Sequence, residues 1–164
     1  MLPHLGAAFT LARYLLREPA DAEDAVQEAY LQALRHFAGF RGENARAWLL
    51  TIVRRVCWAW ADRNRRHGWS TDPELLDDLP GDTDDPETAV LRGELQGQIA
   101  RLVDALPLPF REVIVLREIQ ELSYQEIATV TGVPVGTVMS RLARARRRLQ
   151  RALEAQGMGG AYDM

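Results

Sequence analysis

The 164-residue sequence predicts an all-α protein: two small helical domains joined by an acidic flexible linker, with a C-terminal helix-turn-helix. Apolar residues recur at spacings of three and four in both halves, which is the period of a helix buried along one face. No stretch of any length alternates apolar and polar residues as a strand does. Between the halves, residues 69–90 hold eight acidic residues, three prolines and no basic residue, a composition that favours an extended connector.

This composition sets the expected boundaries. We predict an N-terminal domain over residues 1–68, a linker over 69–92, a C-terminal domain over 93–154 and a tail over 155–164. A linker of this length, fully extended at ~3.3–3.6 Å per residue, reaches up to about 80 Å. The two domains can therefore sit well apart.

Two helices are predicted in the N-terminal half. The first covers residues 21–37, with Asp21 as its expected N-cap, and the glycines of "GFRGEN" end it. The second runs from about Ala45 to Arg65, with Arg54, Trp58 and Arg65 off its buried stripe. The expected core residues of the two helices are Val26, Ala29, Tyr30, Ala33, Leu34 and Phe37, then Leu49, Ile52, Val53, Val56 and Trp60.

The C-terminal half contains the clearest motif. Helices are predicted over Leu91–Leu106 and "PFREVIVLREI", and "SYQE" is a capping box in which Ser123 and Glu126 begin a short helix. Gly132 suits the left-handed residue of a turn, and Pro134 starts a longer helix. The buried stripe of that helix is Val135, Val138, Leu142, Ala145 and Leu149. Two helices joined by such a turn match the helix-turn-helix.

The last predicted helix is rich in arginine although the formal net charge of the chain is −3. Six arginines fall within the eleven residues from Arg141 to Arg151, uninterrupted by an acidic residue. The side chains expected to face outward are Ser140, Arg141, Arg144, Arg147 and Arg148. In a helix-turn-helix this face meets the major groove of DNA. The alternative is a solvated basic face, and the absence of lysine in the chain is explained equally well by codon bias.

Several functions are excluded by what the sequence lacks. Cys57 is the single cysteine, the three histidines are scattered, and no metal-ligand spacing, glycine-rich phosphate loop or paired carboxylates in an identifiable cleft is found. We therefore expect no enzyme, no cofactor and no metal. No apolar run approaches the ~20 residues of a membrane span, and no signal pattern opens the chain, so the expected location is the cytoplasm.

Two blocks of sequence resemble a known family. "LPLPFREVIVLREIQELSYQEIATVTGVPVGTVMSRLARARRRL" resembles the C-terminal domain of the extracytoplasmic-function (ECF) sigma factors of bacterial RNA polymerase. "DAEDAVQEAYLQAL" and "FRGENARAWLLTIVRRVCWAWADRNRR" resemble their N-terminal domain, and the resemblance covers residues 8–153. It implies a sigma factor that binds core RNA polymerase and promoter DNA to start transcription, often in a stress response. It also implies control by an anti-sigma protein.

The resemblance assigns the polar side of the first helix to a coiled coil on the largest polymerase subunit. The matching residues are Asp21, Asp24, Gln27 and Glu28. Alternatively, these side chains only cap and solvate their helix.

The resemblance assigns the second helix to the −10 promoter element and to strand opening. The candidates are Arg54, Arg55, Trp58, Asn64, Arg65 and Arg66, with Trp69 as a weaker one. Trp58 and Trp60 lie about 200° apart on a helix, so both cannot join the core. An aromatic ring among arginines suits base stacking, and the loop after this helix could receive an extruded base. Burial of Trp58 against the other domain or a partner remains an open alternative.

The last helix is assigned to the −35 element by the same resemblance. The candidates are Thr137, Met139, Ser140, Arg141, Arg144, Arg147 and Arg148, the last two expected on phosphates. This chain departs from the family at two positions. Family members often have asparagine where this chain has Arg55, and they usually have a basic residue where it has Met139. Met139 can touch a thymine methyl but cannot bond a guanine edge.

The acidic linker fits a protein that reads two elements separated by two turns of duplex, about 70 Å. The resemblance implies that this linker passes through basic channels of the polymerase. The alternative is that it is a simple solvated tether. Two rival functions stay open: a stand-alone helix-turn-helix regulator, and a sigma-like decoy that sequesters an anti-sigma protein.

Overall fold

The computed structural model describes residues 2–40, 42, 44–65 and 94–155, and within them the chain is helical with no strand, which confirms the all-α prediction. The N-terminal group of helices is α1 (Leu5–Leu15), α2 (Pro19–Arg35) and α3 (Ala45–Arg65). The C-terminal group is α5 (Glu94–Ala105), α6 (Leu108–Ile114), α7 (Tyr124–Thr131) and α8 (Val135–Ala155). Two short 3₁₀ turns belong to the N-terminal group: η1 (Leu2–His4) precedes α1, and η2 (Phe37–Gly39) lies between α2 and α3.

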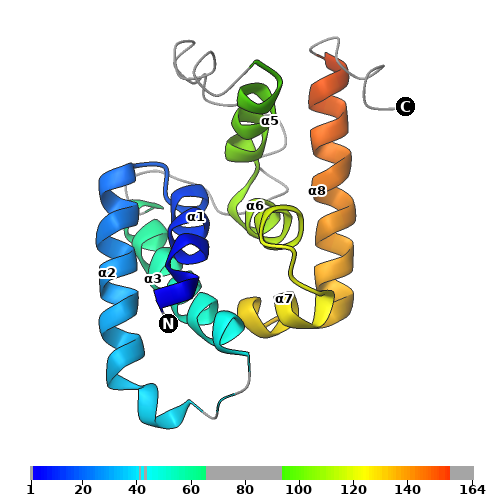
Figure 1. Ribbon diagram of the computed structural model, residues 1–164. Helices are drawn as coiled ribbons and strands as arrows, with labels where there is room; N and C mark the ends of the chain where they lie inside the picture. Colours follow the sequence, from blue (N-terminus) through cyan, green and yellow to red (C-terminus); the bar gives the residue numbers. More distant parts are fainter. Residues whose placement is uncertain (1, 41, 43, 66–93, 156–164) are drawn as a thin grey trace.

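The three N-terminal helices pack against one another (Figure 1). Helix α2 buries alanines along its inner face, which lets α1 and α3 approach it closely. Helix α1 contributes Leu11 and Leu15 to the core, yet the sequence patterns predicted no helix there. The described bounds of α3 are those expected from its apolar spacing.

Two expectations for the first predicted helix are wrong. Its N-cap is Glu18, not Asp21, because Pro19 supplies the fixed φ of a first helical residue and starts the helix earlier. Leu34 and Phe37 are 64% and 52% exposed rather than buried. The α-helix ends at Arg35, and Phe37 in η2 turns its ring toward Trp48, with centroids 6.5 Å apart.

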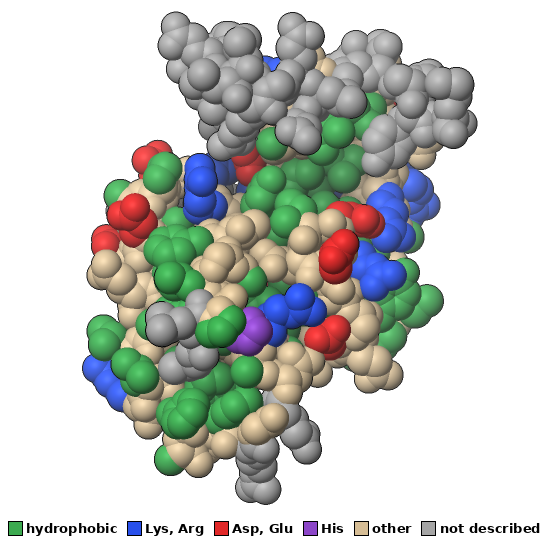
Figure 2. Space-filling model, viewed as in Figure 1, with side chains coloured by type: hydrophobic (Ala, Val, Ile, Leu, Met, Phe, Trp, Pro, Cys, Tyr) green, Lys and Arg blue, Asp and Glu red, His purple; other side chains and the backbone are tan. Residues whose placement is uncertain are grey.

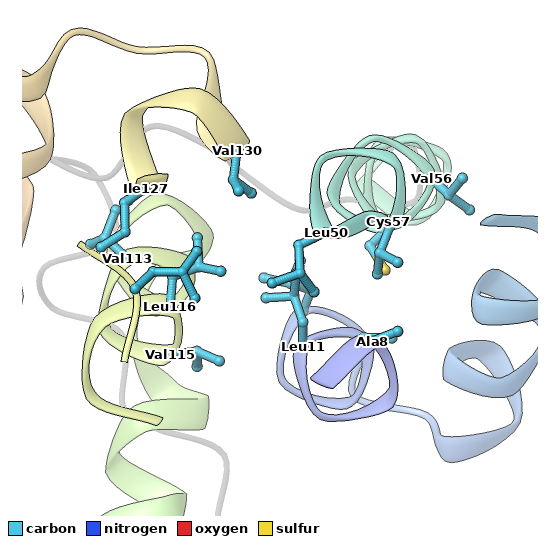
Figure 3. Packing of buried hydrophobic residues seen from close by; sticks show 14 of the residues in the cluster. Ala8, Leu11, Leu50, Val56, Cys57, Val113, Val115, Leu116, Ile127 and Val130 are labelled. Carbon is cyan, nitrogen blue, oxygen red and sulfur yellow. The ribbon is translucent and has the colours of Figure 1, made fainter. Parts of the chain in front are cut away.

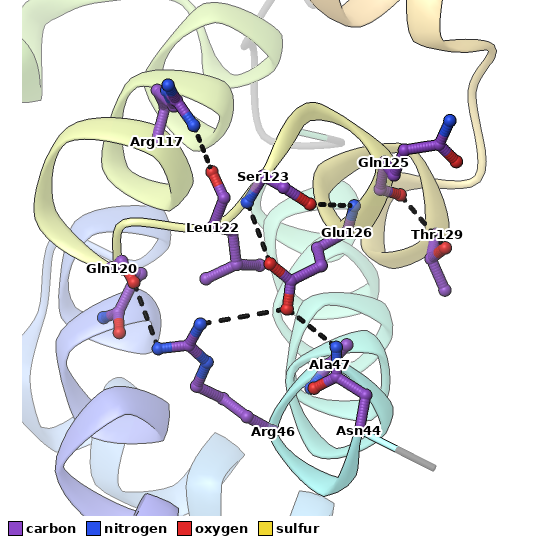
Figure 4. Close-up of polar contacts among 10 residues, drawn as sticks. All are labelled: Asn44, Arg46, Ala47, Arg117, Gln120, Leu122, Ser123, Gln125, Glu126 and Thr129. Atoms are coloured by element: carbon purple, nitrogen blue, oxygen red, sulfur yellow. Dashed lines mark hydrogen bonds and ion pairs between the residues drawn. The ribbon is translucent and has the colours of Figure 1, made fainter.

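The helix-turn-helix forms as predicted. Ser123 Oγ accepts from the Glu126 amide at 3.1 Å, and Glu126 Oε1 accepts from the Ser123 amide at 2.9 Å, which completes the capping box (Figure 4). Gly132 adopts φ 73°, the left-handed conformation that glycine tolerates without strain. Before this motif, α6 continues into η3 (Val115–Ile119), a π-helical turn in which the Gln120 amide bonds the Val115 carbonyl at 3.0 Å.

The two groups of helices share one apolar core. Figure 3 shows Leu11 and Leu50 of the first group pointing toward Leu116 and Val113 of the second, with Ile127 and Val130 beside them. Burying a side chain of this size stabilises the fold by about 1.5–3 kcal/mol relative to leaving it exposed. The structure is therefore a closed arrangement of the two halves.

The expected linker, residues 69–92, and the tail beyond Ala155 lie outside the described residues, so the domain boundaries stay a prediction. Among the helices that the structure describes, none is long and apolar enough to cross a membrane.

Candidate nucleic-acid interface and the contacts around it

Helix α8 presents the predicted −35 residues on two different sides. Met139, Ser140, Arg144 and Arg147 are exposed, Met139 at 51%. The Ser140 hydroxyl donates to the Thr137 carbonyl at 3.1 Å, so its lone pairs stay available to a donor. These side chains form the outer face of the second helix of the helix-turn-helix, which is the face that meets a DNA groove.

Arg141 and Arg148 do not face fully outward as expected. Both are half-buried, seven residues apart on the side of α8 that faces α6. The Arg148 Cζ atom lies 4.7 Å from the ring centroid of Phe110, and that of Arg144 lies 5.9 Å from it. Burial lowers the pKa of Arg148, and the charge of Arg151 acts in the same direction. This packing covers the buried Phe110 ring with guanidinium groups, a favourable cation–π arrangement.

One exposed arginine on the outer face was missed. Arg151 is exposed and continues the series Ser140, Arg144 and Arg147 at helical spacings of three and four. The same spacing rule could have found it from the sequence. Arg146 points elsewhere, since its Nη2 atom lies 2.8 Å from Glu118 Oε1.

Helix α3 carries the predicted −10 residues, and two of them contact the C-terminal half. Arg54 donates from Nε to Glu112 Oε2 at 2.9 Å and from Nη2 to Glu112 Oε1 at 3.2 Å. Trp58 donates from Nε1 to Glu112 Oε2 at 2.7 Å. The Arg54 guanidinium also lies over the Trp58 ring, 4.4 Å from its centroid. In the closed structure Trp58 is half-buried against the other half, so it is neither a fully open stacking ring nor a fully buried side chain.

Glu112 is fully buried, which the sequence patterns did not predict. Burial raises the pKa of the Glu112 carboxyl, while the hydrogen bonds and charge of Arg54, the bond from Trp58 and the charge of Arg141 act against that rise. A buried carboxylate is tolerated because it is paired and hydrogen-bonded on both oxygens.

The remaining −10 candidates differ in position. Arg55 is exposed and lines a pocket of about 570 Å³ between α3 and α7, together with Trp48, Thr51 and Thr129. Asn64 and Arg65 lie in the last turn of α3. Arg66 and Trp69 lie outside the described residues.

Helix α2 carries the predicted polymerase-binding residues on its solvent side. Asp24, Gln27 and Glu28 are exposed and Asp21 is half-exposed. Glu28 Oε2 accepts from Trp60 Nε1 at 3.1 Å. Trp60, the tryptophan expected in the core, is partly buried and lies at the rim of the core.

Apolar side chains adjoin that surface. Leu31, Leu34 and Phe37 are 55%, 64% and 52% exposed. Figure 2 shows hydrophobic side chains gathered at the lower left, over the end of α2. An exposed apolar cluster of this kind is typical of a protein-binding surface.

No group of histidine, cysteine or acidic residues that could hold a metal occurs within the part of the chain that the structure describes.

Comparison with known proteins defines the class. The sigma-70 region 2 model matches residues 2–67, and the sigma-70 region 4 model matches residues 96–149. These two regions in this order define a sigma factor of the sigma-70 class.

Similar sequences narrow the family. The chain is 36% identical over 147 residues to RNA polymerase sigma-H factor of Pseudomonas aeruginosa, covering 85% of this chain and 76% of that protein. It is 33% identical over 155 residues to ECF RNA polymerase sigma-E factor of Escherichia coli K12, covering 90% of this chain and 80% of that protein.

Solved structures agree with the sequences. The sigma factor RpoE in complex with the anti-sigma factor NepR from Bartonella quintana matches with a TM-score of 0.69 and 28% identity, over 93% of both chains. CnrH in complex with the cytosolic domain of CnrY matches with a TM-score of 0.64 and 28% identity, over 92% of this chain and 82% of the other.

The chain belongs to the ECF sigma factors of RNA polymerase. The family suggested by its motifs is thereby confirmed, and sigma factors are regulatory proteins rather than enzymes.

Proposed function

We propose that this sigma factor joins core RNA polymerase through α2 and reads promoter DNA with α8 and α3, working by binding free energy alone. The proposed polymerase contacts are Asp21, Asp24, Gln27 and Glu28. The adjoining exposed side chains of Leu31 and Leu34 extend that surface with apolar area.

The observation that carries the proposal is the exposed series Ser140, Arg144 and Arg147 on the second helix of a capped helix-turn-helix. Residues in the first turns of such a helix reach base edges, and later arginines reach phosphates. We assign Met139, Ser140 and Arg144 to base edges of the −35 element and Arg147 to a phosphate. Thr137, Arg141 and Arg148, on the sides of the helix, complete the surface.

The −10 element is assigned to α3. Arg54, Arg55 and Trp58 supply two cations and an aromatic ring, which is the chemistry that holds unstacked bases. Asn64 and Arg65, in the last turn of α3, and Arg66, which lies outside the described residues, are the further candidates proposed for this element. Because Arg54 and Trp58 contact Glu112 in the closed structure, this role requires the two halves to separate.

We also propose that an anti-sigma protein binds the closed form. One similar solved structure is the sigma factor RpoE in complex with the anti-sigma factor NepR, and it covers 93% of this chain. The other is CnrH in complex with the cytosolic domain of CnrY, and it covers 92% of this chain. Because promoter DNA and RNA polymerase are the proposed partners, we propose that the protein acts in the cytoplasm.

The experiment that tests the proposal is run-off transcription. Purified core RNA polymerase is incubated with and without the protein on a library of genomic promoter fragments from the source organism. Discrete transcripts that depend on the protein are the expected result, and aligning their upstream sequences gives both elements.

The two rivals predict other outcomes of the same experiment. A decoy gives no transcripts although it binds an anti-sigma protein. A stand-alone regulator gives no transcripts with core polymerase but protects duplex promoter DNA by itself.

A further inference from the structure

Glu112 places a carboxylate inside the interface between the two halves. It projects from α6 and its side chain is 0% exposed. The three N–H groups that donate to it belong to Arg54 and Trp58 of α3, 58 and 54 positions earlier in the chain. Arg54 engages both carboxylate oxygens and Trp58 adds a third hydrogen bond at 2.7 Å.

This contact is all-or-none in character. A buried carboxylate is tolerated only while its partners remain, and removing one partner leaves an uncompensated charge. When the halves separate, Glu112 returns to water and both α3 side chains are released. Intermediate positions, in which the carboxylate is dry but unpaired, are strongly disfavoured.

The groups that Glu112 holds are those needed for base capture. Stacking requires an open face of the Trp58 ring, and the Arg54 guanidinium that Glu112 holds covers one face of that ring at 4.4 Å. The indole N–H and the guanidinium that could bond a base or phosphate are bonded to Glu112. Closure and base capture therefore compete for the same atoms.

The outer face of α8 is arranged differently. Ser140 and Arg147 are exposed in the closed structure, and Figure 1 shows α8 on the side of the molecule away from α2 and α3. The proposed surface for duplex DNA is thus open, while Arg54 and Trp58 of the proposed single-strand surface are occupied.

We propose that Glu112 is an intramolecular latch that keeps Arg54 and Trp58 from capturing promoter bases until the two halves separate. The role given to these two side chains rests on the proposed function, whereas the latch itself is a property of the closed protein. The free protein can then contact duplex DNA through α8 but cannot engage an opened −10 strand.

Other polar contacts cross the same interface but are weaker candidates for a latch. Arg46 donates to the Gln120 carbonyl at 3.2 Å, and Gln120 Nε2 donates to the Ala7 carbonyl at 3.2 Å. These are single bonds to main-chain groups. Asn44 Nδ2 also donates across the interface to Glu126 Oε2 at 2.7 Å, but that carboxylate is on a side chain that is 25% exposed. Glu112 contributes a full charge in a dry site, where removing it has the largest effect.

The test uses the full chain and Glu112→Gln, which keeps the shape and removes the charge. Small-angle X-ray scattering gives the radius of gyration, and titration with core polymerase gives the dissociation constant. We expect a compact wild type and a larger radius for the variant. We also expect core binding about tenfold tighter, because polymerase is proposed to bind the protein with its two halves separated, and the apparent affinity falls with the fraction of protein that is closed.

Glu118→Gln is the matched control. It makes the same chemical change on the next turns of the chain, but Glu118 is exposed and pairs with Arg146 inside the C-terminal half. Its radius and its affinity for polymerase should equal those of the wild type.

Equal radii and equal core affinities for Glu112→Gln and the wild type would overturn the latch, as would an expanded wild type. If Glu112→Gln loses helical circular dichroism, Glu112→Met provides the same comparison without a buried polar group. If the wild type does not bind core polymerase, the proposed function fails, and the scattering comparison still decides the latch.

Discussion

Asn44 and Glu126 join the N-terminal ends of two helices, one in each half of the protein. Asn44 Nδ2 donates to Glu126 Oε2 at 2.7 Å across 82 positions of sequence, as Figure 4 shows. The Asn44 side chain also caps α3 by accepting from the Ala47 amide at 3.1 Å, while Glu126 Oε1 completes the cap of α7. The two capping groups thus stabilise their own helices and the closed arrangement together.

Replacing Glu126 with alanine should destabilise the protein more than an ordinary surface change. It removes the reciprocal half of the capping box and the bond from Asn44, so we expect the free energy of unfolding to fall by about 1–2 kcal/mol. Glu126→Gln keeps acceptor and shape and should lose less. Urea denaturation at neutral pH measures the free energy of unfolding of both variants. An equal loss of stability in the two variants would contradict the role given to the Glu126 side chain as a hydrogen-bond acceptor.

The same carboxylate predicts a pH dependence. The hydrogen bond from the Ser123 amide, then that from Asn44, lowers the pKa of Glu126. A depressed pKa stabilises the folded state above the ordinary value of about 4.3, and that contribution disappears as pH falls through the folded-state pKa. The stability gap between wild type and Glu126→Gln should therefore narrow on acidification, and a gap that widens would reverse the sign argued here.

Cys57 should be unreactive in the folded protein. It is fully buried, and burial raises the pKa of its thiol to about 12, so almost no thiolate exists at pH 8. Iodoacetamide should label it only after denaturation. Rapid labelling of the native protein, read by mass spectrometry, would instead indicate an accessible thiol suited to sensing oxidants.

Arg111 should be a major structural residue. It is 3% exposed, and its guanidinium donates to the carbonyls of Asp104 at 2.8 Å and of Leu15 at 3.4 Å. Burial lowers the pKa of Arg111 to about 10, and Arg17 acts in the same direction. Arg111→Ala should lower the free energy of unfolding by about 3 kcal/mol through lost bonds and a cavity.

Arg111→Lys is the informative companion variant. It keeps the charge but loses the planar fork, so thermal unfolding should place it between wild type and Arg111→Ala. A loss for Arg111→Ala below about 0.5 kcal/mol, the range of ordinary surface substitutions, would show that these bonds contribute little.

Arg147 and Arg146 offer a matched pair for testing the DNA face of α8. Arg147 is exposed on the outer face, whereas Arg146 pairs with Glu118 at the side. Arg147→Ala should weaken duplex binding on all sequences and reduce the slope of log affinity against log salt by about 1. Arg146→Ala should leave that slope unchanged, and the reverse pattern would place the DNA on the other side.

Met139 should set the preference at one base pair. Its side chain is 51% exposed, and it can contact a thymine methyl without hydrogen bonding. When the Met139→Arg variant selects its binding sites from a library of duplexes, the selected sites should change to guanine at one position. The variant should favour guanine over the other bases there by about 1–3 kcal/mol of binding free energy. An unchanged selected sequence would remove Met139 from the base-reading surface.

Local signals predicted the elements whose ends are chemically marked. The box of Ser123 and Glu126, the turn at Gly132 and the apolar spacing of α3 each gave the observed bounds. Helix α1 was missed because its start carries no side-chain cap and no acidic residue in its first turn.

Local sequence patterns did not predict which charged side chains are buried. Glu112 and Arg111 look like ordinary surface residues, and their burial depends on partners such as Arg54 and Leu15 that the chain brings together only on folding. Exposure of Leu34 was missed for a related reason, since periodicity finds an apolar stripe but not whether another helix covers it.

The π-helical turn η3 has a consequence for how the length of this chain can vary. A π turn holds one residue more than an α turn, because its amides bond carbonyls five positions back, as Gln120 does with Val115. Deleting one residue between positions 115 and 119 would let the segment close as an α turn that continues α6. Single-residue gaps between related chains should therefore be tolerated at this point, ahead of the helix-turn-helix, more readily than inside α7 or α8.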